Sequence, residues 1–432
     1  MAWFKKNLLL FLFSLLLLSH SLCAALKSAT FVLPVKKDGA TLQYVTRVQQ
    51  RTPPTLLNLV VDLGARYLWV DCDKGYVSST YGSVYCGTAE CNLTASQGCT
   101  DCSLPRRPGC DKNTCSVGIE GRTVGTGGVL AQDALSIAST NGTVPGPSAT
   151  IPKFVFSCAP SFLLKGLARG AKGMLGLGRG NLGLPLQLAS AFPVSTKFAV
   201  CLSSTTTSNG VMFFGDGPYE ISSGVDASAR FKYTPLFVNP VSTAGSYIAG
   251  EESVEYFIGV RSVKVNGTAV PLKKSLLSID EEGHGGTKIS TTAPYTQLQT
   301  SIYTAVTGAF ATAMGSTTRV APVGKLKLCY DAKDVGARYT GPAVPTIDLV
   351  LQDESVYWSI LGANSMVEAK KGVLCLAFVD GGINPTTSIV IGGHQIEDNL
   401  LQFDIANSRL GFTSSLWIVK TTCASYNFQS LP

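Results

Sequence analysis

The sequence predicts an all-β protein, mainly strands with a few short helices, that folds as two lobes. Its 432 residues exceed the usual size of one hydrophobic core and suit two lobes of about 200 residues each. Glycine (44) and proline (21) are abundant and only 15% of the residues are charged, which is typical of loop-rich β proteins. Apolar residues fall in short runs that often alternate with polar residues, as they do in strands.

The N-terminus predicts a secretory signal peptide over residues 1–25. Lys5 and Lys6 precede a short apolar run at residues 8–18, and small residues follow around Cys23. This run is too short to span a membrane, and no later segment has the roughly 18 apolar residues that a span needs. The mature chain is therefore expected to be extracellular, with no membrane attachment. Loss of the two lysines lowers the net charge from +7 to +5, and no basic cluster of the nucleic-acid-binding kind is present.

Thirteen cysteines are present, and Cys23 leaves with the signal peptide. The even number that remains, in an oxidising compartment, predicts six disulfides. No metal site is expected, because no histidine lies near the cysteine cluster at residues 86–115. Three sequons predict glycosylation at Asn92, Asn141 and Asn266. The twelve cysteines of the mature chain are Cys72, Cys86, Cys91, Cys99, Cys102, Cys110, Cys115, Cys158, Cys201, Cys329, Cys375 and Cys423.

The first lobe is expected to span residues 26–225. Its alternating and buried-type runs predict strands within 28–50, 56–70, 154–158, 173–178, 198–202 and 210–215, and glycines near the tip of 121–133 predict a hairpin. A short helix is expected from Leu184, and a disulfide-pinned excursion over 72–116. These elements precede a stretch of polar turn residues that marks the lobe boundary.

The second lobe is expected to span residues 226–432. A helix is predicted over about 296–313, because Leu298, Ile302 and Phe310 recur at helical spacing. The remaining apolar runs predict strands at 256–260, 263–267, 276–279, 347–351, 374–378, 388–393, 401–404 and 409–412.

An apolar run that ends in an aspartate organises the first lobe. Val60-Val61-Asp62-Leu63-Gly64 has the outline of the first active-site loop of pepsin-like aspartic proteases, which reads Asp-Thr-Gly or Asp-Ser-Gly. In the second half, Ile289 precedes Ser290-Thr291-Thr292, and the runs 389–395 and 403–412 match the closing strands of those proteases. The mature chain therefore resembles the bilobal pepsin-like fold over essentially its whole length, with Ser290 in the position of the second aspartate.

This resemblance implies that Asp62 and Ser290 are vestigial rather than catalytic. An aspartic protease needs two carboxylates that share one proton, so that one activates water while the other polarises the carbonyl group. The hydroxyl of Ser290 can fill neither role. The hairpin also lacks the tyrosine that these proteases place there, and Leu63 replaces a hydroxyl residue. We therefore predict no enzymatic activity, and interpret Asp62 as a buried structural carboxylate held by N–H groups of the facing loop.

Within this fold, the chain more closely resembles a group of secreted plant proteins. The group includes the xyloglucan-specific endoglucanase inhibitors, the extracellular dermal glycoproteins, the wheat-type xylanase inhibitors and the basic 7S seed globulins. The resemblance implies pairs Cys72–Cys158, Cys201–Cys423 and Cys329–Cys375, with the other six cysteines paired among themselves, and no cofactor or metal. The runs on which it rests are 68–73, 75–79, 197–203, 214–219, 286–290 and 397–401.

The function implied is that of a monomeric apoplastic inhibitor, whose second-lobe loops enter the cleft of a microbial endoglucanase of glycoside hydrolase family 12. There an arginine pairs with two catalytic carboxylates. Arg319 stands in the loop where such inhibitors carry this arginine and is the first candidate for it. The alternative interpretation is an ordinary exposed arginine just past the end of the predicted helix. Thr386 stands where they often carry a second arginine. This departure favours the alternative, a non-inhibitory storage, defence-responsive or peptide-binding cell-wall glycoprotein.

Overall fold

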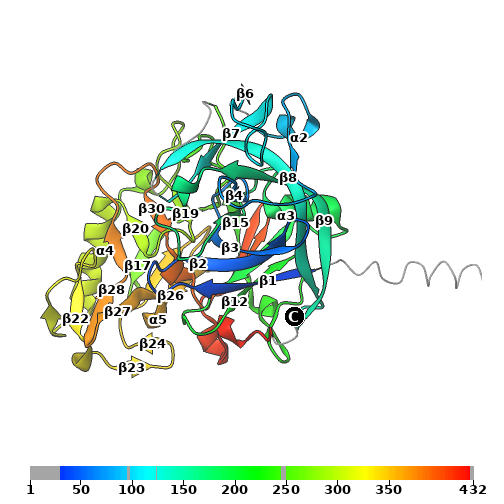
Figure 1. Cartoon of the computed structure of the whole chain (residues 1–432). Helices are drawn as coiled ribbons and strands as arrows, with labels where there is room; N and C mark the ends of the chain where they lie inside the picture. The colour runs from blue at the N-terminus through cyan, green and yellow to red at the C-terminus, as the bar shows by residue number, and fades with distance from the viewer. Residues whose placement is uncertain (1–29, 95–97, 123, 245–249, 429–432) are drawn as a thin grey trace, which may run out of the picture.

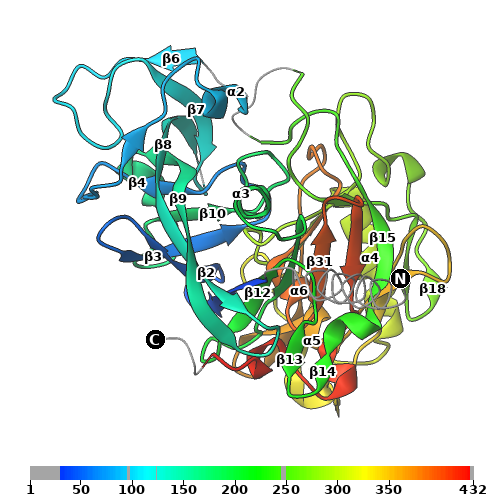
Figure 2. The same cartoon turned by 90° about the vertical axis from the view of Figure 1, so that its right-hand side faces the viewer.

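The computed structural model describes residues 30–94, 98–122, 124–244 and 250–428, so the predicted signal peptide lies outside the described residues. The described chain is mainly β, as predicted. Figures 1 and 2 show the early strands β1 (Phe31–Lys37) to β9 (Pro145–Ala159) gathered on one side of the molecule. Later elements such as α4 (Thr300–Ala313) and β22 (Cys329–Asp331) lie on the other side.

The first half contains fourteen strands among its described residues, with two α-helices, α2 (Ala89–Asn92) and α3 (Leu184–Ala191), and two 3-10 turns, η1 (Ser161–Leu164) and η2 (Ala227–Arg230). Besides β1 and β9, the strands are β2 (Tyr44–Gln50), β3 (Thr55–Asp62), β4 (Trp69–Asp71), β5 (Gly82–Ser83), β6 (Gly98–Thr100), β7 (Thr114–Glu120), β8 (Gly125–Thr140), β10 (Gly173–Gly176), β11 (Lys197–Cys201), β12 (Gly210–Phe214), β13 (Glu220–Ser222) and β14 (Val225–Asp226).

The second half adds short strands, the long helix α4 and two one-turn helices, α5 (Gly362–Ser365) and α6 (Gly393–Ile396). Its 3-10 turns are η3 (Lys274–Leu276), η4 (Ala332–Asp334), η5 (Leu416–Val419) and η6 (Cys423–Ser425). Besides β22, the strands are β15 (Lys232–Phe237), β16 (Phe257–Ile258), β17 (Ser262–Val265), β18 (Thr268–Ala269), β19 (Thr287–Ile289), β20 (Thr296–Leu298), β21 (Arg319–Val320), β23 (Ala337–Arg338), β24 (Gly341–Pro342), β25 (Ile347–Val350), β26 (Tyr357–Ile360), β27 (Met366–Lys370), β28 (Val373–Leu376), β29 (Phe378–Asp380), β30 (Ile389–Ile391), β31 (Leu400–Asp404) and β32 (Arg409–Phe412).

Strand β3 places Asp62 at its carboxyl end. It pairs antiparallel with β2 and parallel with β10, and its apolar residues from Leu57 onward (Leu57, Leu59, Val60 and Val61) are buried between neighbouring strands. The parallel strand must carry glycine at two positions. A Cβ on Gly173 would lie 1.8 Å from the carbonyl oxygen of Trp69, and a Cβ on Gly176 would lie 2.3 Å from that of Tyr67. The paired glycines in the sequence therefore mark this close backbone packing.

A similar arrangement holds Ser290 in the second half. Strand β19 ends one residue before Ser290 and runs parallel to β30. Gly392, directly after β30, again allows close packing, because a Cβ there would lie 2.3 Å from the carbonyl carbon of Tyr295. One strand of a parallel pair thus ends at Asp62 in the first half and directly before Ser290 in the second.

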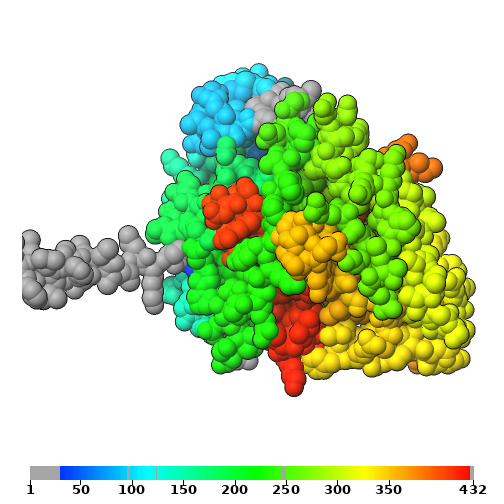
Figure 3. Space-filling model, turned by 180° about the vertical axis from the view of Figure 1, so that it is seen from behind, coloured from blue at the N-terminus to red at the C-terminus, as the bar shows by residue number. Residues whose placement is uncertain are grey.

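The two halves share a sheet and a core. Strand β31 from the second half pairs antiparallel with β11 from the first, and the Phe198 and Phe403 rings on these strands stack 4.8 Å apart. Figure 3 shows the red C-terminal segments bordered by green and yellow parts of the chain. Strand β14 spans the predicted boundary between residues 225 and 226, and that boundary stays a prediction.

Six disulfides are present, so the predicted count is confirmed. One of them joins residues 222 positions apart and links the first half to the C-terminal turn η6. The pairs are Cys72–Cys158, Cys86–Cys99, Cys91–Cys115, Cys102–Cys110, Cys201–Cys423 and Cys329–Cys375, and they include all three that the resemblance implied.

Two predicted elements differ from the structure. The helix over 296–313 begins later, because residues 296–298 form β20 and pair with β29 and β30. Gln299 then caps α4, since its side-chain oxygen accepts the Ser301 N–H at 2.8 Å. The strand predicted over 276–279 is wrong. Leu276 ends the turn η3, in which the Leu277 N–H donates to the Lys274 carbonyl at 3.0 Å, and Leu277 is the residue of this run that is buried in the core.

Candidate functional site

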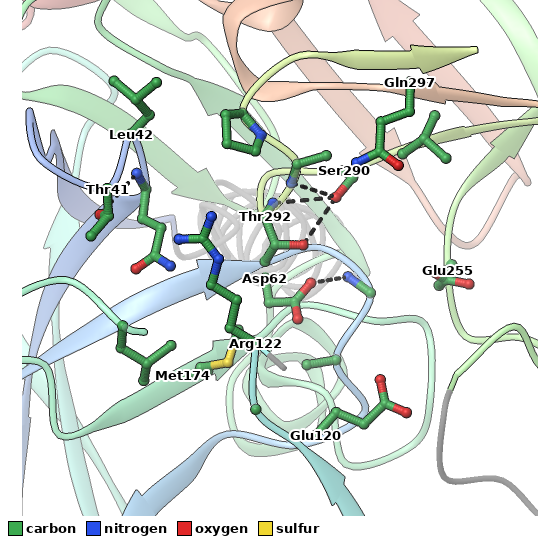
Figure 4. A pocket seen from close by; sticks show the side chains of 18 of the residues that line it. Thr41, Leu42, Asp62, Glu120, Arg122, Met174, Glu255, Ser290, Thr292 and Gln297 are labelled. Carbon is green, nitrogen blue, oxygen red and sulfur yellow. Dashed lines mark hydrogen bonds between the residues drawn. The ribbon is translucent and has the colours of Figure 1, made fainter. Parts of the chain in front are cut away.

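A cleft of about 860 Å³ brings Asp62 and Ser290 together. Figure 4 shows both side chains facing this cavity with Thr292 beside them, and Glu120 and Arg122 also line it. The cleft is lined from both halves of the chain, since residues 62–69 and 118–122 face residues 288–297. The structure therefore assembles the site that the two loop sequences predict.

Asp62 is held by its own loop. Its Oδ1 accepts the Gly64 N–H at 2.8 Å. The sequence interpretation was that N–H groups of the facing loop hold this carboxylate. It is wrong, because the N–H donor belongs to the same loop as Asp62. The Ser290 hydroxyl oxygen is likewise bound locally, because it accepts the N–H groups of Thr292 and Ala293, each at 3.2 Å. Each side chain thus stabilises the turn that presents it.

Thr291 makes the bonds that cross between the two loops. Its hydroxyl donates to the Val61 carbonyl at 2.7 Å and accepts the Leu63 N–H at 3.2 Å. Thr291 is 1% exposed, so both bonds are shielded from water. Leu63 has no hydroxyl with which to make the reciprocal bonds, and its side chain is buried in the core instead. Thr291 therefore makes both of these hydrogen bonds between the Asp62 loop and the Ser290 loop, and Leu63 makes none with its side chain.

Burial raises the pKa of Asp62 to about 6. The bond from the Gly64 N–H opposes this shift, while Glu255 and Glu120 add to it. Glu255 is not available to share a proton with Asp62, because both of its carboxylate oxygens already have partners. Its Oε1 lies 2.7 Å from the Lys288 ammonium, and its Oε2 accepts the Thr243 hydroxyl. Asp62 is therefore a half-buried carboxyl group with a raised pKa, next to hydroxyls and the Glu255–Lys288 ion pair.

The hairpin of β7 and β8 covers one side of the cleft. Its turn is closed by the Gly121 N–H, which donates to the Val124 carbonyl at 2.9 Å. Trp69 fixes its base, since the indole N–H donates to the Glu120 carbonyl at 3.0 Å. Arg122 at the tip is exposed and reaches the Gly166 carbonyl at 3.4 Å. The hairpin thus presents an arginine near the cleft, with no tyrosine at the described tip residues.

Arg319 begins β21, a short strand that pairs with β22. It is exposed, and none of the ion pairs among the described residues includes it. The Cys329–Cys375 disulfide joins β22 to β28, so the hairpin is anchored to the second half. Arg319 therefore lies on a fixed strand rather than at a helix end. Its guanidinium interacts with the Tyr330 hydroxyl across the strand pair and opposes the rise that burial causes in the pKa of that tyrosine.

Thr386 is exposed in the loop between β29 and β30, and its role as a contact residue stays a prediction. Its carbonyl accepts the Gly285 N–H at 2.8 Å, which ties this loop to the segment before β19. It lines a small pocket of about 200 Å³ that shares Lys288 and Gln297 with the main cleft. Thr386 and the cleft therefore occupy neighbouring parts of one surface.

Two cations of this surface were missed in the sequence. Lys325 lines the cleft from the tight turn of the Arg319 hairpin, where Val323 and Leu326 exchange two backbone bonds of 3.0 Å. Lys288 lies between buried Thr287 and buried Ile289 and points into the cleft. The available signal for Lys288 was its place next to the apolar Ile289 at the loop of Ser290, whereas nothing in the sequence placed Lys325 at the cleft.

Other predicted site features remain predictions. Asn92, Asn141 and Asn266 are all exposed, as glycosylation requires. Within the described ranges there is no helix long and apolar enough to cross a membrane. The same residues contain no group of three metal-ligating side chains.

Comparison with known proteins defines the class. Residues 44–216 match the family model "Xylanase inhibitor N-terminal", and residues 255–414 match "Xylanase inhibitor C-terminal". The chain belongs to this xylanase-inhibitor family and has a pepsin-like fold.

Individual relatives have divergent names. A protein of Nicotiana benthamiana named "Probable aspartic proteinase GIP2" is 53% identical over 405 residues, which cover 93% of this chain and 92% of the relative. Gamma conglutin 1 of Prunus dulcis is 43% identical over 441 residues, which cover 99% of this chain and 98% of the relative. The crystal structure of edgp matches with a TM-score of 0.92 and 53% identity, over 94% of this chain and all of that one.

Proposed function

We propose that this protein is a secreted, catalytically inactive inhibitor of a microbial cell-wall-degrading endoglucanase, a xyloglucanase of glycoside hydrolase family 12. In this proposal, loops of the second half enter the cleft of the hydrolase. The observation that carries the proposal is Arg319, which is exposed and outside every ion pair of the described residues, on a disulfide-anchored hairpin. Membership of the xylanase-inhibitor family supports a glycoside hydrolase as the partner.

Lack of proteolysis follows from the chemistry of the cleft. Asp62 has no second carboxylate with which to share a proton, because Ser290 is engaged by two backbone N–H groups and Glu255 is paired with Lys288. A hydroxyl does not ionise near neutral pH, so Ser290 cannot activate water. We therefore propose that the cleft is a structural feature of the fold and not an active site.

Inhibition requires a cation that matches two carboxylates. Glycoside hydrolases of this type use a carboxylate pair on either side of the bond that they cleave. A guanidinium is always charged and binds a carboxylate through two parallel N–H bonds. Lys325 and Lys327, both exposed at the other end of the same hairpin, add positive charge that would speed encounter with an acidic cleft.

A matched pair of arginine variants tests this proposal. Arg319→Gln is expected to weaken inhibition of a family 12 xyloglucanase by at least about tenfold, because a lost partner in a buried charge pair costs about 2 kcal/mol or more. Arg338→Gln, at an exposed arginine on the separate hairpin of β23 and β24, is expected to leave inhibition unchanged. Equal inhibition by the Arg319→Gln variant would reject the role of this residue.

The second candidate is a non-inhibitory cell-wall glycoprotein, and Thr386 is the observation that favours it. A threonine offers no charge at a position where inhibitors of the group often carry arginine. Thr386→Arg discriminates between the two functions. If the native protein is inactive against the hydrolase and the variant inhibits it, the non-inhibitory function is correct; if the native protein already inhibits, the first proposal stands.

A further inference from the structure

An open groove of about 1290 Å³ lies on the second half of the molecule, and it shares no lining residue with the Asp62 cleft. It runs between the end of β15, the residues after β16, the segment 274–286 and the turn at residues 353–354. None of its lining residues is among the predicted site residues, so neither Arg319 nor Thr386 belongs to them. We refer to this feature as the acidic groove.

The floor of the acidic groove is apolar. Ile258, Val260 and Leu277 are buried beneath it, while Phe237 and Val238 are 47% and 44% exposed along it. Gly259 leaves room for the Phe237 ring, since a Cβ at that glycine would lie 3.1 Å from its Cε2. Large apolar side chains that stay half exposed beside a concave surface are typical of a docking site.

The rim of the acidic groove has a charge opposite to that of the whole protein. Five carboxylates line it and only two cations, Arg261 and Lys274, although the chain as a whole has a net charge of +7. Glu354 is neutralised by Lys264 at 2.5 Å, and Arg261 donates to the Gln352 carbonyl at 2.7 Å. The five carboxylates are Asp280, Glu281, Glu282, Asp353 and Glu354.

Glu281 and Glu282 are the carboxylates best placed to meet a partner. Both are exposed in the turn between Asp280 and Gly283, and no ion pair within the described ranges includes either of them. The turn itself is fixed, because the Gly283 N–H donates to the Asp280 carbonyl at 3.1 Å and the Asn239 amide donates to the Gly283 carbonyl at 2.8 Å. Two adjacent charges are therefore presented on rigid backbone.

We infer that the acidic groove docks a basic peptide segment of a partner protein, one in which an aromatic or aliphatic side chain is flanked by lysine or arginine. The apolar side chain would cover Phe237 and Val238 and remove them from water. The flanking cations would meet Glu281 and Glu282, which repel acidic partners. This inference does not rest on the proposed inhibition of a hydrolase, because it concerns a different set of residues.

Fluorescence anisotropy with a labelled synthetic peptide, Lys-Lys-Phe-Leu-Lys-Lys, tests the inference on the mature protein. Saturable binding is expected, and the double change Glu281→Lys with Glu282→Lys is expected to weaken it at least tenfold. Phe237→Ser is expected to weaken it to a similar extent by removing the apolar contact. Asp334→Lys, a reversal of charge at an exposed residue elsewhere in the second half, should leave binding unchanged.

Several outcomes would overturn the inference. Equal binding of a peptide with serine in place of Phe and Leu would reduce the groove to a diffuse charged surface, as would binding that survives the double charge reversal. Absence of saturable binding at low ionic strength would reject it outright. Self-association of the native protein that the double reversal abolishes, seen by analytical ultracentrifugation, would assign the groove to a second copy of the chain instead.

Discussion

Asp62 occupies the position of a catalytic acid without a partner that could share its proton. Its folded pKa of about 6 lies above the ordinary value of 3.8, because burial disfavours the charged form. The folded chain therefore binds more protons than the unfolded chain between these two values. It follows that Asp62 makes the protein less stable as pH rises through this window, and that the whole penalty is present above pH 6.

Asp62→Asn should consequently stabilise the protein at neutral pH. The amide keeps an oxygen that can accept the Gly64 N–H, but it has no charge to bury. We expect a gain of about 1–3 kcal/mol in the free energy of unfolding at pH 7 and no gain at pH 3, measured by denaturant unfolding. Asp334→Asn, at an exposed carboxylate, serves as the control. A loss of stability at pH 7 would contradict this account of Asp62.

The sequence was informative about which residues meet at this site and less so about their bonds. The order of apolar residue, acid and glycine placed Asp62, and the repeat in the second half placed Ser290. The partner of Asp62 was assigned to the facing loop, yet the bond comes from Gly64. A sequence pattern fixes the path of the backbone, whereas the direction of a side chain within a tight turn depends on geometry that the pattern does not encode.

Among the elements, the two central loops are joined mainly through Thr291. Thr291→Val keeps the shape of the side chain but removes the hydroxyl that serves both Val61 and Leu63. Because the Leu63 N–H would then be buried without a partner, we expect a loss of about 1–3 kcal/mol in unfolding free energy. Thr292→Val, which removes a hydroxyl whose partner among the described residues is the nearby Ser290 hydroxyl, should cost less than about 0.5 kcal/mol. Equal effects of the two changes would argue against the cross-loop bonds.

The start of one predicted helix and one whole predicted strand differ from the structure, and both come from short apolar runs. Periodicity extended the helix back to residue 296, and an apolar run suggested a strand at 276–279. Residues 296–298 form a strand because β20 pairs with β29 and β30. The run 276–279 instead starts at the end of the 3-10 turn η3 and forms part of the wall of the acidic groove. Short apolar runs do not distinguish strand from helix or turn, so pairing with distant strands decides the outcome.

At the scale of the whole molecule, Glu397 joins the two halves. It is 1% exposed, and its Oε1 accepts the Tyr44 hydroxyl at 2.7 Å and lies 2.6 Å from the Lys37 ammonium. His394 approaches the other oxygen at 3.2 Å. Burial alone would raise the pKa of Glu397, but the bond and charge of His394, with the charge of Lys37, hold it below its ordinary value. Length and pattern predicted two lobes, whereas this junction between residues far apart in the chain was not visible in the sequence.

Glu397→Gln should therefore destabilise the protein far more than the loss of a surface ion pair. Removing one partner of a buried pair costs about 3 kcal/mol or more at pH 7. Because the folded pKa of Glu397 is lowered, its stabilisation is present above the unfolded value of 4.5 and is lost as pH falls, so native and variant should converge in acid. Glu354→Gln, which breaks the exposed pair with Lys264, should cost less than about 1 kcal/mol. Urea unfolding at pH 7 and pH 3 compares them, and a small effect of Glu397→Gln at pH 7 would contradict the account.

The central claim is that this protein blocks the cleft of an endoglucanase with the hairpin that carries Arg319. Steady-state hydrolysis of xyloglucan by a family 12 enzyme, measured at several concentrations of the purified protein, tests it most directly. A plug in the substrate cleft competes with substrate, so we expect the apparent KM to rise while kcat stays constant. Undiminished hydrolysis at an equimolar excess, or a fall in kcat at constant KM, would contradict the claim.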